Sequence, residues 1–162
     1  VNEMKNPDNK KDMESTLQYM GLKGGQSLLN LPIDAAFIGS CTNARLDDLR
    51  SAARILKDNK VASNVLAICT PGSADVKQKA ELEGIDQIFK DAGFQWREPG
   101  CSLCFYAGGE GFLPQQRVIT STNRNFRGRQ GRGVRSHLAS PITVAASAVA
   151  GKIISPQKLT KQ

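Results

Sequence analysis

Four short segments of the chain resemble strands, and each of them ends in a small polar loop. The segments are residues 33–39, 65–69, 94–98 and 117–122, and their loops read GSCTN, TPGS, PGCSLC and STNRNF in that order. Apolar runs such as IDAAFIG and VLAIC are typical of strands that are buried on both faces of a parallel sheet. This pattern restricts the fold strongly, because a buried strand needs packed segments above and below it.

Helical patterns alternate with these strands. They cover residues 13–22, 44–57, 73–84, 85–93 and 140–152. The alternation predicts an α/β fold, a three-layer α/β/α domain with a mainly parallel sheet. Ligands of such sheets bind beyond the carboxyl ends of the strands, so we expect the four polar loops to meet at one edge.

The polar N-terminal residues differ from the rest of the chain. We expect residues 1–12 to form a flexible arm, and residues 13–162 to form a single α/β domain. That domain begins with a helical stripe of three apolar side chains, Met13, Leu17 and Met20.

The composition is that of a folded domain. Of the 162 residues, 40% are hydrophobic and 23% are charged, which supports a packed core and excludes global disorder. No apolar run approaches the ~20 residues of a membrane-spanning helix. The first residues also lack the apolar stretch of a secretory signal. The composition therefore excludes membrane, collagen-like and disulfide-scaffold proteins, and we expect a cytoplasmic location.

The net charge of +7 is concentrated in the last third of the chain. Residues 1–110 carry 13 basic and 15 acidic residues, a balance of −2, whereas residues 111–162 carry nine basic residues and no acidic one. Five of those nine lie between Arg124 and Arg135. Such a segment indicates an anionic partner, which could be a nucleic acid, a phosphate or a carboxylate metabolite.

Three of the four cysteines are candidate metal ligands. Cys101 and Cys104 are two thiols on one short loop, and Cys41 lies in the loop after another strand. Three thiolates are an incomplete set for a four-iron cluster, and an incomplete set leaves one metal open for substrate. The CxxC pair alone is equally compatible with a zinc half-site or a thiol-redox pair. Cys69 lies inside an apolar strand, where a buried thiol is the simpler interpretation.

Other polar side chains have both a functional and a structural interpretation. Arg124 and Arg129 lie in a loop with few acids nearby, and a guanidinium matches a carboxylate with two hydrogen bonds. A solvated basic loop or an RNA contact fits the same residues. Asn43 and Asn123 could bind a substrate or cap a turn. His137 is the only histidine, and a structural role is the more common one for a lone histidine.

Three motifs in order resemble the aconitase superfamily. They are FIGSCTNARLDDLRSAARIL, WREPGCSLC, and STNRNFRGRQGRG followed by RSHLASP. Within the superfamily they resemble most the large subunits of the 3-isopropylmalate dehydratase (isopropylmalate isomerase) family, which the YMGL segment also fits. The resemblance covers about residues 13–160 and matches the last domain of a longer large subunit.

The resemblance implies a set of site residues and a reaction. Cys41, Cys101 and Cys104 would hold a 4Fe–4S cluster, and Arg124, Arg129 and Asn123 would bind the substrate. The family reaction removes water and adds it back, which moves a hydroxyl to the adjacent carbon of a hydroxy di- or tricarboxylate. In the leucine pathway this step interconverts 2-isopropylmalate and 3-isopropylmalate.

The resemblance also implies missing parts and leaves the substrate open. In the family, the acid/base groups come from earlier domains and from a swivelling domain or small subunit, so we expect this chain alone to be incomplete for turnover. Arg127 stands where leucine-pathway members usually have Glu, a change of two charge units beside the substrate arginines. The alternative functions are an RNA-binding module and a CxxC redox or zinc module, for which Cys41 would be dispensable.

Overall fold

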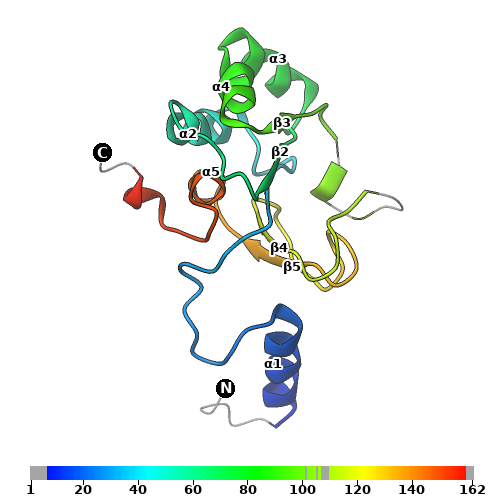
Figure 1. Ribbon diagram of the computed structural model, residues 1–162. Coiled ribbons are helices and arrows are strands. Elements are labelled where there is room, and N and C mark those ends of the chain that lie inside the picture. The colour runs from blue at the N-terminus through cyan, green and yellow to red at the C-terminus, as the bar shows by residue number, and fades with distance from the viewer. Residues whose placement is uncertain (1–6, 101, 105, 107–109, 160–162) are drawn as a thin grey trace.

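The computed structural model of the chain describes residues 7–100, 102–104, 106 and 110–159. Its centre is a five-stranded sheet with the order β3-β2-β1-β4-β5 (Figure 1). The strands are β1 (Ala35–Ile38), β2 (Leu66–Cys69), β3 (Gln95–Trp96), β4 (Arg117–Thr120) and β5 (Arg135–Leu138). Every neighbouring pair is parallel. The α/β class and the parallel sheet predicted from the sequence are therefore confirmed.

Helices cover one face of the sheet. They are α2 (Leu46–Leu56), α3 (Ala74–Leu82), α4 (Ile85–Ala92) and α5 (Pro141–Ala150). Side chains of α2, α4 and α5 form one apolar cluster with the strand residues that point to this face. Burial of a large apolar side chain contributes about 1.5–3 kcal/mol, so this cluster is the main source of stability.

Loops cover the other face of the sheet. A smaller apolar cluster joins strand residues such as Phe37 to Leu103, Phe112 and Val134, and these three come from the two loops on either side of β4. The expected third layer is thus formed by these loops and the short 3₁₀ helix η1 (Ser102–Cys104). Connections between parallel strands are right-handed, so the segments that enter β4 and β5 lie opposite α2 and α3.

The helix ends follow known capping rules. Ser73 precedes α3, and its hydroxyl accepts a hydrogen bond from Val76 N at 3.2 Å. The Asp48 carboxylate in the first turn of α2 accepts from Arg45 N at 3.1 Å. Gly93 follows α4 with φ +105°, a left-handed conformation that favours glycine. For α2 to α5 the predicted and observed helix ends differ by at most two residues.

Three features of the fold differ from the sequence-based expectation: the start of α1, its apolar stripe, and strand β5. Helix α1 (Pro7–Met20) begins within the segment expected to be an arm, so residues 7–12 are helical. Met13 is 39% exposed and belongs to no apolar cluster of the described residues, so the expected stripe is incomplete. Strand β5 was not predicted, because its sequence RSHL contains no apolar run.

None of the described helices is long and apolar enough to cross a membrane.

Candidate functional site

The strand order has a topological switch point between β1 and β4. The chain runs outward from β1 through β2 to β3, and then crosses to β4 and β5 on the other side. At such a switch point the loops after the two central strands diverge and leave a crevice beyond their carboxyl ends. A broad cleft lies at this place, and the loops after β1, β4 and β5 line it with Thr42, Asn43, Thr122, Asn123 and Ser140, among others.

The loops after β1 and β4 are joined by hydrogen bonds at this edge. The Ser121 side chain accepts from Gly39 N at 3.0 Å and lies within hydrogen-bond distance of Gly39 O and Asn43 O. Asn43 Nδ2 donates to Ser121 O at 2.8 Å. The side-chain amide of Asn43 therefore holds the two loops together, which is the structural one of its two predicted roles.

Cys41 lies in the β1 loop beside a strained residue. Its side chain is exposed and forms no disulfide among the described cysteines. The preceding residue, Ser40, has φ +109°, which is unfavourable for a residue with a side chain. The Ser40 hydroxyl offsets this cost, because it accepts hydrogen bonds from the backbone N–H groups of Thr42 and Asn43 at 3.3 and 3.2 Å. The β1 loop thus holds a free thiol on a constrained turn.

Cys104 lies on η1, in the loop between β3 and β4, and its side chain is half-buried. The buried Gln130 connects this loop to the sheet. Its side-chain Nε2 donates to Leu103 O at 2.9 Å, and its Oε1 accepts from the Ser136 hydroxyl at 2.8 Å. Ser102 on the same 3₁₀ turn has φ +36°, so a second strained serine lies close to a predicted cluster cysteine.

Arg129 contacts Cys104. Its Nη2 donates to Cys104 Sγ at 3.5 Å, and its guanidinium carbon lies 5.4 Å from the centre of the Phe126 ring. Arg129 Nε is buried and has no hydrogen-bond partner among the described residues. A buried donor without a partner is costly, so this guanidinium is well suited to an anionic ligand. The structure thus brings a predicted substrate residue to a predicted cluster ligand.

Four other arginines of the last third of the chain fall into two groups. Arg117, Arg127 and Arg135 hydrogen-bond to α1. Arg124 is exposed, and no hydrogen bond or ion pair of its guanidinium is found among the described residues. The guanidinium of Arg127 is directed towards α1, where it contacts Ser15 and the Tyr19 ring.

His137 has a structural role. It lies on β5 with 9% of its surface exposed, and its Nε2 accepts a hydrogen bond from Arg117 Nη1 at 2.8 Å. Burial and the neighbouring Arg117 charge lower the pKa of His137 to about 4, because both disfavour the imidazolium. The imidazole is therefore neutral at physiological pH and is bound to the sheet.

The predicted ligand set is only partly described. Cys101 lies outside the described residues, while Cys41 and Cys104 follow strands whose carboxyl ends share one edge. Among the described residues no group of three His, Cys, Asp or Glu side chains is close enough to hold a metal. Cys69 is fully buried in β2, and burial raises the pKa of its thiol, as expected for a packing residue.

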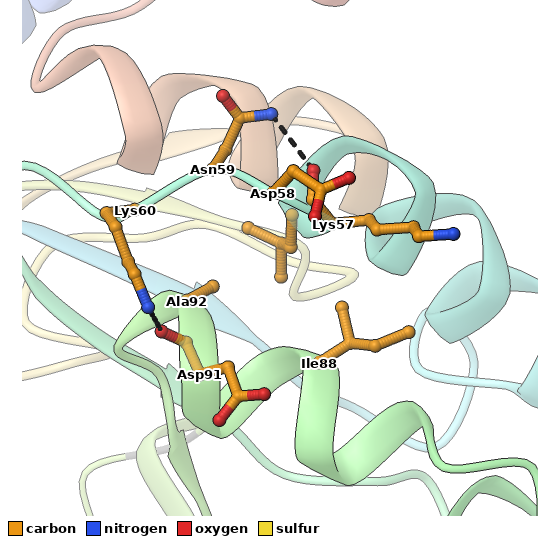
Figure 2. Close-up of a pocket in the computed structure, with 8 residues that line it drawn as sticks. Lys57, Asp58, Asn59, Lys60, Ile88, Asp91 and Ala92 are labelled. Carbon is orange, nitrogen blue, oxygen red and sulfur yellow. Dashed lines mark hydrogen bonds between the residues drawn. The ribbon is translucent and has the colours of Figure 1, made fainter.

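A second concavity lies between the last turns of α2 and α4 (Figure 2). Both helices run back from the carboxyl edge, so their ends lie at the opposite edge of the sheet. Its polar groups are bound to each other: Lys60 Nζ donates to Asp91 O, and Asn59 Nδ2 donates to Lys57 O at 3.3 Å. Asn43 and Asn123 line the cleft at the other edge.

Two comparisons with known proteins bear on this edge. The model of the aconitase family (aconitate hydratase) matches residues 1–151. The 3-isopropylmalate dehydratase large subunit of Cupriavidus necator is 60% identical over 151 residues, which is 93% of this chain and 57% of that relative. The chain thus spans a little over half the length of this relative, and the family match includes every loop described above.

Proposed function

Since the chain belongs to the aconitase family, we propose that it is the cluster-carrying part of a hydro-lyase that acts on a hydroxy di- or tricarboxylate. The observation that supports this function most is the contact between Arg129 and Cys104. In this contact a guanidinium, which is well suited to a carboxylate ligand, lies beside a thiol of the CxxC motif, and such an enzyme must combine carboxylate binding with cluster binding.

The residues at the carboxyl edge fit an iron–sulfur cluster. Cys41 and Cys104 are free thiols on two constrained loops, and Cys101 is the third proposed ligand. When bound, a cluster held by three cysteines supplies one iron as a Lewis acid for the hydroxyl and carboxylate of the substrate. The Arg129 guanidinium donates a hydrogen bond to Cys104 Sγ, which suits a sulfur that carries negative charge.

The substrate carboxylates would be held by the arginine loop, which we define as residues 121–134. Arg129 is half-buried and has an unpartnered Nε, and Arg124 is exposed in the same loop. Asn123 lines the cleft together with Asn43. We propose that Arg124 and Arg129 bind carboxylates and that Asn123 donates to the substrate. The name of the 60% identical relative favours 2-isopropylmalate and 3-isopropylmalate as the pair that is interconverted.

Turnover would require further parts of the enzyme. The single histidine, His137, is buried and bound to Arg117, so it is not placed as a general acid or base. The relative is a large subunit, and the matched part spans 57% of it. We therefore propose that other large-subunit domains and a small subunit complete the site, and that they supply the proton transfers.

A binding experiment on the anaerobically reconstituted chain tests this function. We expect 3-isopropylmalate to bind the parent, and Arg129→Lys to weaken its binding at least tenfold, because Lys cannot reproduce the two-pronged contact with a carboxylate. Arg132→Lys is the matched control, since Arg132 is exposed in the same loop. Equal loss of affinity in the two variants, or no binding to the parent, would contradict the proposal.

A further inference from the structure

Helix α1 is attached to the domain in an unusual way. No residue of α1 belongs to either apolar cluster of the described chain, and along the helix only Leu17, Tyr19 and Met20 are partly buried among the residues whose exposure is described. A helix that buries so little apolar surface must be held by specific polar contacts. Figure 1 shows α1 beside β5, at the lower end of the domain.

The last turn of α1 has all four of its carbonyl groups occupied. Leu22 N donates to Leu17 O and Gly21 N donates to Gln18 O, at 2.9 and 3.1 Å, a Schellman motif. The two remaining carbonyls are bound by arginines of the sheet. Arg135 Nε donates to Tyr19 O at 3.2 Å, and Arg117 Nη2 donates to Met20 O at 3.1 Å. These cations also favour a helix C-terminus electrostatically.

The Tyr19 side chain then reaches the arginine loop. Its hydroxyl donates to Val134 O at 2.9 Å and accepts from Gly128 N at 3.3 Å. These two groups lie at either end of the turn that contains Arg129. Gly128 has φ +83°, a left-handed conformation that glycine adopts without steric cost. One hydroxyl therefore holds both ends of this turn.

Arg127 strengthens the same contact. Its Nη2 donates to Ser15 Oγ at 2.7 Å, and its guanidinium carbon lies 5.2 Å from the centre of the Tyr19 ring, in a cation–π arrangement. The charge of Arg127 is thus used to bind α1. Ser15 and Tyr19, which make these contacts with the loop, lie on one face of the last two turns of α1.

We propose that Tyr19 is a positioning residue for the carboxylate site. Its hydroxyl fixes the turn over residues 128–134 and so holds Arg129 beside Cys104. This inference rests on the proposed function only for the identity of the ligand. The expected effect on the loop depends on the hydrogen bonds of Tyr19 and not on the identity of the ligand.

Substitution of Tyr19 by Phe tests the role of the hydroxyl. The ring and its contact with Arg127 remain, while the hydrogen bonds to Gly128 and Val134 are lost. We expect amide exchange at Gly128 and trypsin cleavage after Arg127 and Arg129 to accelerate at least on the order of fivefold, because both hydrogen bonds of the hydroxyl are lost. The melting temperature should remain within about 1 °C, because α1 belongs to neither apolar cluster.

Tyr106→Phe is the matched control. Tyr106 is the other tyrosine of the chain, 44% exposed, and its hydroxyl has no hydrogen bond to the described residues. The control should keep the parent rates of exchange and cleavage. Unchanged rates in Tyr19→Phe would overturn the proposal, and so would a loss of protection that spreads evenly to α5.

A ligand measurement separates this inference from the proposed function. If the parent binds 3-isopropylmalate, Tyr19→Phe should weaken binding on the order of fivefold while the iron content stays that of the parent. Unchanged affinity would overturn the positioning role. If the parent binds no 3-isopropylmalate, the proposed substrate is wrong, and the exchange and cleavage rates still decide whether Tyr19 holds the loop.

Discussion

The two faces of the sheet are built in different ways. The face covered by α2, α4 and α5 is a continuous apolar cluster, in which side chains such as Leu49 and Phe89 are fully buried. The face covered by loops has a much smaller apolar cluster around Phe37. There the loops are held by buried polar groups such as Gln130, whose side chain hydrogen-bonds to Leu103 O, Thr120 and Ser136.

This difference separates stability from function. Apolar packing offers no polar groups for binding or catalysis, but it contributes most of the favourable free energy of folding. Hydrogen bonds contribute less each, but they fix the direction of a loop. The loop-covered face, which includes the candidate metal ligand Cys104, therefore depends more on hydrogen bonds. The helix-covered face contributes most of the folding energy. Substitutions on the two faces should have different consequences.

The largest expected effect is on the helix-covered face. Phe89 is fully buried, and its ring lies 5.3 Å from Phe94 and 5.5 Å from Trp96. Phe89→Ala should lower the free energy of unfolding by about 3–5 kcal/mol in urea titration, because it leaves a cavity. In the molecules that remain folded, the rate of thiol labelling at Cys104 should not change. A loss below about 1 kcal/mol would show that this cluster does not dominate stability.

A change of pH acts on β5, the edge strand of the sheet, through His137. The pKa of His137 is lowered to about 4 in the folded chain, against an ordinary value of 6.5. The unfolded chain therefore binds a proton first as the pH falls. This contribution to stability is complete above pH 6.5 and is lost between about pH 6.5 and 4, roughly 3 kcal/mol in all.

The matched variant for this titration is His137→Gln. Glutamine can accept the hydrogen bond from Arg117 but does not titrate, so urea titrations from pH 7 to 4 should show a shallower loss of stability than in the parent. Arg135 and Asp34 also lie near this pair, and both are unchanged in the variant. An identical pH dependence in the two proteins would contradict the buried, neutral histidine.

The smallest of the three effects is expected at Gln130, which is 1% exposed. Gln130→Leu keeps the volume and removes the hydrogen bond to Leu103 O, which should cost about 2 kcal/mol in urea titration. Unlike Phe89→Ala, it should also accelerate thiol labelling at Cys104. Gln87→Leu on the exposed side of α4 is the control and should change stability by less than about 0.5 kcal/mol. Unchanged labelling at Cys104 would show that Gln130 does not hold this loop.

Local patterns in the sequence were sufficient for most of the fold. Buried strands and amphipathic helices depend on neighbouring residues, so the strand predicted at 65–69 is β2 and the helix predicted at 44–57 is α2. Strand β5 was missed because its pairing with β4, rather than its own composition, makes it a strand. The start of α1 was missed because its first turns carry no apolar stripe.

The site was predicted less completely, for a physical reason. The order of strands and loops was enough to place Cys41, Asn43 and Arg129 near one edge. The contacts between loops were not predictable, because they join residues far apart in the chain. The bond from Arg129 to Cys104 and the contact of Arg127 with Tyr19 are of this kind. The role of Cys101 stays a prediction, since it lies outside the described residues.

The central claim is that three cysteines at the carboxyl edge hold a cluster beside the arginine loop. Iron and sulfide per chain, measured after strictly anaerobic reconstitution, test it most directly. We expect a stable cluster in the parent and in Cys69→Ala, whose thiol is buried in β2, and none in Cys41→Ser. Unchanged iron content in Cys41→Ser would contradict the claim, because the CxxC pair would then be sufficient to bind the metal.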